Sequence, residues 1–375
     1  MLHTIRTCIE SALSRAERSA IDPRRFLCVD GSRGRVDGGC CLFLAPDGAE
    51  PVLVAKAARS PERQAAYRTE FENLRTLDAT GLNAARRSTP RPLGMAEEGG
   101  VLVTLQSALP GRLMRSLPGR ELFSRDGAGA TVRRACSWQR ELEQTFAPRR
   151  VTVDGALYER EVLALVRRIR RRFLLETDEI AFLTRRFEHD RRLLGLELPL
   201  TVGHGDFCAA NLVVQDGGIG AFDWEHALVH RLPLYDLFFF FSSTRFPFRG
   251  LRRESSYARS LVAAFWGENH LNRLLREQLQ AACSALAIPD AAVSDLFLLA
   301  LLLRADRKYD TFAAAAGIAD PAAGAAESEK RRAWAALAEH ERDAPLLWMR
   351  AGTLLSLRHA VRYGLPAFAA DPACP

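Results

Sequence analysis

Length, composition and charge already exclude several classes of protein. The chain has 375 residues, 48% of them hydrophobic, so it can bury a large core and form two domains. Its formal net charge of +7 comes mostly from Arg, because only Lys56, Lys308 and Lys330 are lysines. The basic residues are dispersed and no nucleic-acid-binding motif accompanies them, so we expect no nucleic-acid partner.

The cysteines and the apolar runs indicate where such a chain would work. The eight cysteines form no Cys-x-x-Cys pair, which is typical of free thiols in a reducing compartment. The longest apolar run, 296–303, is far shorter than the roughly 18–20 residues that cross a bilayer. We therefore expect no transmembrane segment and a cytoplasmic location, and no pattern indicates an obligate protein partner.

The first hundred residues predict mainly strands. A short amphipathic helix is expected over 1–22, followed by strands over 26–29, 40–45 and 51–56 with glycine-bearing connections. This order predicts an antiparallel meander. A helix over 61–77 and a further strand over 100–105 follow.

The remainder predicts helices, apart from 200–222, with loops at 127–130 and 314–329. Strands first and helices later indicate an α+β chain. We expect an N-terminal lobe over 1–106, with an antiparallel sheet and one main helix, and a larger, mostly helical lobe over 107–375. The arginine cluster at 167–172 favours a solvated helix face over an anion-binding patch. The four phenylalanines at 238–241 predict a buried helix rather than a membrane anchor.

Chemistry-bearing residues concentrate between His204 and Asp223. Asp206 and Asn211 lie in one loop, and two short strands, 212–214 and 219–222, then lead to Asp223. A hairpin made of these strands would return Asp223 to the side of Asn211. Transfer of a phosphoryl group needs such positioned charges: a carboxylate base, oxygen ligands for a metal, and a cation.

This segment resembles the signature of aminoglycoside phosphotransferases, choline kinases and related small-molecule kinases. The resemblance covers roughly residues 26–242 and implies a protein-kinase-like two-lobed fold that uses ATP and Mg²⁺. It implies that Asp206 is the catalytic base and that Asn211 and Asp223 hold the metal. His204 is similar to the histidine that structures the loop.

Further residues match this family at single positions. Asp236 resembles its buried aspartate that anchors the catalytic loop, although an ordinary helix N-cap would look the same. Glu225 and His226 follow Asp223 in a pattern found among small-molecule kinases, and either metal contacts or simple loop contacts would account for them.

The resemblance also implies the residues that would bind the nucleotide. Lys56 ends a strand and matches the lysine that orients phosphates. Its partner is expected to be Glu70, with Glu72 as the competitor; about 200° of helix rotation separates them, so only one can face Lys56. Gly31 and Gly34 lie where a glycine-rich loop would cover the phosphates, although an ordinary hairpin turn has the same composition.

The acceptor is the least defined part. We expect a hydroxyl group of a small molecule or glycan, bound by the helical regions 112–200 and 250–370. Because residues 112–200 are net basic, a polycationic aminoglycoside fits less well than a neutral or anionic sugar. The alternatives are an aminoglycoside-modifying enzyme and a non-catalytic nucleotide-binding regulatory protein on the same fold.

Overall fold

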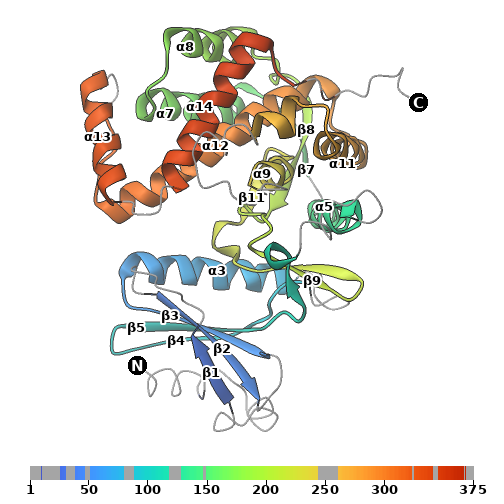
Figure 1. Cartoon of the computed structure of the whole chain (residues 1–375), viewed down its shortest axis with the longest axis vertical. Coiled ribbons are helices and arrows are strands. Elements are labelled where there is room, and N and C mark those ends of the chain that lie inside the picture. The colour runs from blue at the N-terminus through green and yellow to red at the C-terminus, as the bar shows by residue number, and fades with distance from the viewer. Residues whose placement is uncertain are drawn as a thin grey trace. The chain divides into compact units, whose positions relative to one another are not determined.

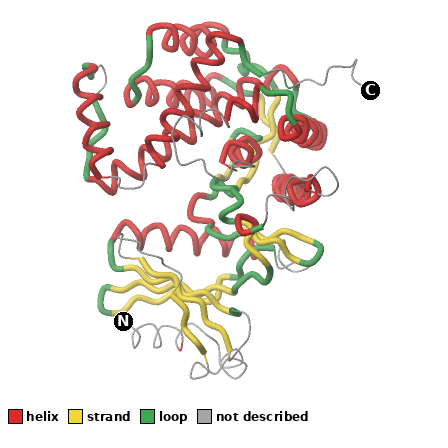
Figure 2. Tube along the Cα trace, viewed as in Figure 1, coloured by secondary structure: helices red, strands yellow, loops and turns green. Residues whose placement is uncertain are grey.

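The computed structural model divides the chain into two compact units (Figures 1 and 2). Unit 1 comprises residues 1–118 and 204–228, and unit 2 comprises 119–203 and 229–375. The predicted lobe boundary at residues 106–107 stays a prediction. The structure describes residues 10, 26–30, 39–46, 51–79, 88–117, 128–146, 149–243, 261–322, 325–340, 345–366 and 368. The predicted N-terminal helix, apart from Glu10, and the loop with Gly31 and Gly34 lie outside these residues.

Unit 1 is built on a five-stranded antiparallel sheet. Its strands lie in the order β1-β2-β3-β5-β4, which confirms the predicted meander. Their bounds are Phe26–Asp30 (β1), Gly39–Pro46 (β2), Leu53–Ala58 (β3), Pro92–Glu98 (β4) and Val101–Ser107 (β5). Strand β4 was not predicted, because the proline at its start and the glycine within it are residues that strands usually lack, except at the edge of a sheet.

Helix α3 (Pro61–Ala79) packs on this sheet through β3, β4 and β5 (Figure 1). It begins where Ser60 Oγ accepts a hydrogen bond from the Arg63 amide, with Pro61 in the first turn. Its buried side chains are Tyr67, Glu70, Leu74 and Leu77. This spacing of three and four residues places a glutamate on the apolar face, among core residues.

A second, three-stranded sheet of unit 1 supports the predicted catalytic loop. It has the order β10-β9-β6, formed by Gly218–Ala221 (β10), Leu212–Gln215 (β9) and Arg112–Leu113 (β6). β9 and β10 form the predicted hairpin, closed at a two-residue turn in which Gly217 has a φ of 82°. A short 3-10 helix, η2 (Met114–Ser116), follows β6.

Unit 2 is mostly helical (Figure 2). Its α-helices are Ala128–Thr145 (α5), Gly155–Tyr158 (α6), Ala164–Arg172 (α7), Thr177–Leu183 (α8), Tyr235–Ser243 (α9), His270–Leu286 (α11), Asp290–Ala316 (α12), Glu327–His340 (α13) and Pro345–Tyr363 (α14). Two π-helical segments, Glu159–Leu163 (η3) and Thr184–Asp190 (η4), extend α6 and α8. The predicted loop at 127–130 is wrong from residue 128 onward, because α5 begins there.

Unit 2 also contains strands that the sequence did not predict. Arg149–Thr152 (β7) and Leu228–Arg231 (β11) flank Glu197–Gly203 (β8) in the order β11-β8-β7. Both flanking strands are only four residues long and contain arginine, so they lack the apolar alternation of a longer strand. The expectation of helices outside residues 200–222 is therefore wrong for β7 and β11, although unit 2 is mostly helical as predicted.

The helix α9 confirms the prediction of a buried phenylalanine run. Phe238, Phe239, Phe240 and Phe241 are all buried, and Phe238 packs edge-on against Phe297 of α12 at 5.3 Å between ring centroids. In the described part of the chain, no single helix is long and apolar enough to span a membrane; the pair α11 and α12 passes that test only jointly, with a bend of 115°.

Two arginines of the cluster in α7 are paired with carboxylates of unit 2. Arg172 is buried, and its guanidinium contacts the carboxylates of Asp306, Asp310 and Asp320 at 2.6–2.7 Å. Arg168 also pairs with Asp306 at 2.7 Å. Much of the local positive charge is therefore neutralised within unit 2.

Candidate active site

The loop that follows β8 begins with a buried histidine. His204 is fully buried, and its Nε2 donates a hydrogen bond to the Phe222 carbonyl oxygen at 2.9 Å. Its Nδ1 accepts one from the Asp206 amide at 3.2 Å. These two bonds require the neutral imidazole with its proton on Nε2. The ring also lies 4.5 Å from the Trp224 ring, tilted by 48°, and thus ties the loop to the segment after β10.

Asp206 and Asn211 are held together by side-chain hydrogen bonds. Asn211 Nδ2 donates to Asp206 Oδ2 at 2.9 Å and to the Asp206 carbonyl oxygen at 3.0 Å. Because the amide nitrogen is committed to Asp206, Asn211 presents its Oδ1 as the remaining ligand atom. Asp206 is half-buried, so its carboxylate is accessible to a reactant.

The hairpin returns Asp223 to the start of β9. The Phe222 amide donates to the Asn211 carbonyl oxygen at 3.1 Å, so Asp223 directly follows a residue that is paired with Asn211. Asp223 itself has a φ of 72° and a ψ of 60°, in the left-handed region. Such a conformation is unusual for a non-glycine residue, although aspartate tolerates it better than most.

Lys56 links Asp223 to helix α3. Its Nζ lies 2.6 and 2.8 Å from the two carboxylate oxygens of Glu70 and 2.9 Å from Asp223 Oδ1. Burial lowers the pKa of Lys56, but the carboxylates of Glu70 and Asp223 more than offset this and raise it above its usual value, so the ammonium stays charged.

The structure distinguishes the two glutamates that could face Lys56. Glu70 lies on the buried face of α3, whereas Glu72 is exposed and contacts Arg75 of the same helix at 3.3 Å. The Lys56 ammonium also lies 5.7 Å from the ring centroid of Tyr67, which belongs to the same buried face.

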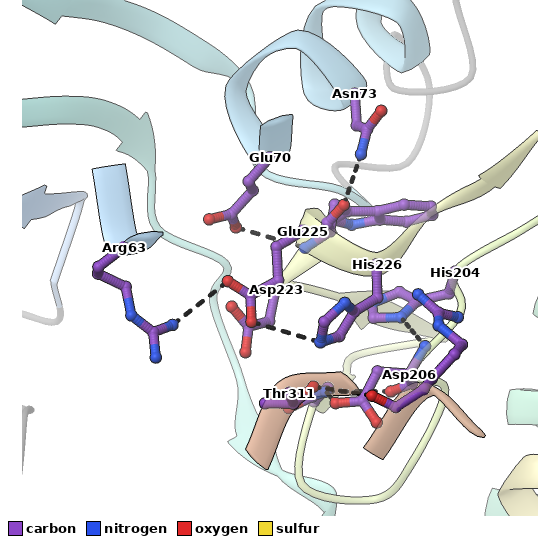
Figure 3. A network of polar contacts seen from close by, with 12 residues as sticks. Arg63, Glu70, Asn73, His204, Asp206, Asp223, Glu225, His226 and Thr311 are labelled. Atoms are coloured by element: carbon purple, nitrogen blue, oxygen red, sulfur yellow. Dashed lines mark hydrogen bonds and ion pairs between the residues drawn. The ribbon is translucent and has the colours of Figure 1, made fainter. Parts of the chain in front are cut away.

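Helix α3 also contacts the residues that follow Asp223, in the 3-10 helix η5 (Trp224–His226) (Figure 3). Asn73 Nδ2 donates to the Trp224 carbonyl oxygen at 2.8 Å, and the Trp224 amide lies 3.4 Å from Glu70 Oε1. Arg63 Nη1 lies 3.4 Å from Glu225 Oε2, and His226 Nε2 lies 3.5 Å from Glu225 Oε1.

Arg63 and Asn73 were not identified from the sequence. Asn73 follows Glu70 by three residues and so shares its helix face, which was the one available signal. The partner of Arg63, Glu225, is 162 positions away, and nothing local in the sequence connects them. The side-chain contacts described for Glu225 are with Arg63 and His226.

Asp236 lies in unit 2 and was a candidate anchor or N-cap. It is the second residue of α9 rather than its cap, and it is buried. A Cβ atom built on Gly203 would lie 2.7 Å from Asp236 Oδ2, so only glycine fits at this position without a shift. The carboxylate therefore lies against the end of β8, directly before His204 in the sequence.

The possible metal ligands are oxygen atoms. Asn211 Oδ1 and the Asp223 carboxylate are ligands of the hard type that Mg²⁺ prefers. Among the described residues, no group of three or more His, Cys, Asp and Glu side chains could enclose a metal by itself. This donor set fits an ion that completes its shell with water and phosphate oxygens.

The chain was compared with curated protein sequences and with solved structures. No curated protein sequence matches the chain significantly. Among solved structures, an aminoglycoside phosphotransferase from Streptomyces rimosus is similar, with 16% identity, a TM-score of 0.43 and coverage of 77% of this chain and 94% of the other. A choline kinase from Cryptosporidium parvum has 9% identity, a TM-score of 0.43 and coverage of 92% and 96%. An amicoumacin kinase in complex with AMP-PNP and Ca²⁺ has 14% identity, a TM-score of 0.42 and coverage of 90% and 96%.

A family match covers most of the candidate site. The model of the "Phosphotransferase enzyme family" matches residues 43–268, which include β3, α3 and the entire segment from His204 to Asp236. This confirms the prediction of a kinase with a hydroxyl acceptor. Since the match spans more than half of the 375 residues, the chain belongs to the phosphotransferase enzyme family.

Proposed function

We propose that this enzyme transfers the γ-phosphoryl group of ATP to a hydroxyl group of a small molecule or glycan. The observation that carries the proposal is the Lys56 ammonium, held by Glu70 and Asp223 within one unit that also contains the Asp206–Asn211 pair. A cation, a carboxylate base and oxygen ligands are the groups that phosphoryl transfer requires.

Asp206 is the proposed catalytic base. The Asn211 amide holds Asp206 Oδ2, which orients Oδ1 to accept the proton of the attacking hydroxyl group. His204 binds the Asp206 amide and so fixes the backbone from which this carboxylate projects. The loop thereby positions the base before the acceptor arrives.

Lys56, Asn211 and Asp223 serve the donor. Lys56 orients the phosphates while Glu70 keeps its ammonium in place, and Asn211 Oδ1 with Asp223 would hold Mg²⁺. The bound metal would neutralise charge on the phosphate oxygens. Gly31 and Gly34 stay candidates for covering these phosphates, and Asp236 for anchoring the catalytic loop.

For the acceptor, we propose a neutral or anionic sugar-like hydroxyl compound. The positive net charge of residues 112–200 favours this class. Arg168 and Arg172 contribute less to that charge, because they form ion pairs with Asp306. A comparison of sugars, amino alcohols and aminoglycosides as stimulators of ADP release would identify the acceptor class.

The decisive experiment measures Mg²⁺-dependent ATP hydrolysis and nucleotide binding in matched variants. Asp206→Ala should lose hydrolysis by about 10²-fold or more, because the base is gone, yet still bind nucleotide. Asp223→Asn should lose the Mg²⁺-dependent part of nucleotide binding, since a metal ligand loses its charge. Asp216→Asn, in the exposed hairpin turn, is the control and should behave like the wild type.

Two outcomes would contradict the proposal. Nucleotide binding without turnover on water or on any hydroxyl acceptor would favour the regulatory alternative. Wild-type hydrolysis in Asp206→Ala would exclude Asp206 as the base.

A further inference from the structure

Unit 2 buries a carboxyl group near Asp236 that the proposed transfer does not use. Glu143 of α5 is 1% exposed, and its Oε1 lies 3.5 Å from Thr201 Oγ1 on β8. The backbone amide of Leu234, just before α9, donates a hydrogen bond to the same carboxyl group. Glu143 therefore contacts β8 and the start of α9 from a third element.

Burial and the charge of Asp236 disfavour the ionised form of Glu143 more strongly than the hydrogen bonds with Gln139, Leu234 and Thr201 favour it. Asp236 of α9 adds a nearby negative charge, and Cys283 of α11 is a buried thiol whose own pKa is raised to about 12, mainly by burial. Gln139 on α5 and Thr201 on β8 are uncharged. No Lys, Arg or His in the described part of the chain forms an ion pair with Glu143, and its Oε2 has no hydrogen-bond partner there. Burial and the charge of Asp236 raise the pKa of Glu143 to about 8.

The contacts of Glu143 lie at both segments that support the catalytic loop. Thr201 is two residues before Gly203, whose Cα lies against Asp236 and which is bonded to His204. Leu234 has a φ of 70°, a strained value for leucine that needs support from its surroundings. A neutral carboxylic acid can accept from the Leu234 amide without placing a second negative charge beside Asp236.

We propose that Glu143 is a positioning residue of the phosphotransferase, acting as a neutral carboxylic acid that holds the end of β8 and the start of α9 together. Ionisation at alkaline pH sets two buried carboxylates against each other and shifts Gly203 and the loop that follows it. The catalytic part of this inference rests on the proposed function.

The test compares the wild type with Glu143→Gln, which preserves shape and neutrality, and with Glu141→Gln, an exposed control on the same helix. The readout is kcat for Mg²⁺-dependent ATP hydrolysis from pH 6 to 10. One unit above a pKa of about 8, the wild type and Glu141→Gln should lose about tenfold in kcat. Glu143→Gln should stay within about twofold of wild type at pH 7 and lack this alkaline decline. A decline of the same size in Glu143→Gln, or loss of its activity at pH 7, would overturn the proposal.

A second measurement needs no activity and so separates this inference from the proposed function. Infrared difference spectra of wild type minus Glu143→Gln should contain a carboxylic-acid C=O band at pH 7 that disappears by pH 10. Folding raises the pKa of Glu143, so the folded state binds its proton more tightly; the Tm of the wild type should therefore fall relative to Glu143→Gln between about pH 5 and 9. Absence of the band at pH 7 would refute the neutral acid even in an active enzyme, whereas its presence in a protein without turnover would refute only the catalytic part.

Discussion

Asp223 is a proposed metal ligand, and its backbone lies in the left-handed region. It is one of four non-glycine residues with positive φ in the described part of the chain. A left-handed conformation costs an ordinary L-residue about 1–2 kcal/mol, which the fold must offset elsewhere. The hydrogen bond of Phe222 to Asn211 and the contact of Asp223 with Lys56 provide that compensation.

Substitutions at Asp223 can separate the backbone cost from the side-chain role. Asp223→Ala and Asp223→Gly both remove the contact with Lys56, but only glycine adopts this φ without strain. We expect Asp223→Gly to exceed Asp223→Ala by about 1 kcal/mol in free energy of unfolding, measured by urea denaturation. The pair Asp216→Gly and Asp216→Ala is the control, where glycine should give no advantage. Equal stability of the two Asp223 variants would show that the strain is absent in solution.

At the scale of elements, three side chains connect helix α3 to Asp223 and to η5. Asn73 contacts Trp224, and Arg63 contacts Glu225 (Figure 3). Glu70 is linked to Asp223 through the ammonium of Lys56. The position of the helix thus determines where the lysine and the proposed metal ligand meet. A substitution that loosens α3 should therefore weaken nucleotide binding even where the substituted residue does not contact the nucleotide.

Asn73 offers a specific test of this coupling. Asn73→Ala removes one hydrogen bond to the Trp224 carbonyl oxygen, which keeps a bond from the Ala227 amide. We expect a loss of about 1 kcal/mol in the free energy of unfolding and faster amide exchange in residues 223–227. Glu72→Gln, exposed on the opposite face, should change the free energy of unfolding by less than about 0.5 kcal/mol. Unchanged exchange in Asn73→Ala would mean that α3 does not hold η5.

At the scale of the molecule, Arg172 and its carboxylate partners all belong to unit 2, so their ion pairs should stabilise that unit. Arg172 joins α7 to Asp306 and Asp310 of α12 and to Asp320 beyond it. Removal of a buried partner leaves a buried charge without its counterion, which is more costly than loss of an exposed pair.

Arg172→Met should therefore lower the free energy of unfolding by about 3 kcal/mol, because Arg168 is then the one remaining ion-pair partner of buried Asp306 among the described residues. Hydrogen exchange should locate the loss in peptides of unit 2, while peptides from β3 and α3 retain their protection. Arg331→Met, which breaks an exposed pair with Glu327, is the control and should cost less than about 0.5 kcal/mol. Uniform loss of protection in both units would show that they unfold as one.

Features of this protein that depend on residues close together in the chain could be predicted from the sequence. The spacing of Asp206, Asn211 and Asp223 follows from a loop and a hairpin. The helix period indicated that only one of Glu70 and Glu72 can face Lys56, and the family resemblance favoured Glu70. The short strands β7 and β11 depend on pairing with β8, so their own residues carry little signal. Glu143 and Arg172 look like surface residues of charged helices, because their partners Thr201 and Asp306 lie 58 and 134 positions away.

The order of the two units along the chain has a consequence for synthesis. The polypeptide leaves unit 1 after residue 118, re-enters it at His204 and leaves again after Leu228. On the ribosome, β3 and α3 emerge early, but Asp223 is 167 positions behind Lys56. A nascent chain therefore carries a lysine–glutamate pair whose third member follows only after residues 119–203 of unit 2 have been translated, and this interval is when chaperones would most be needed.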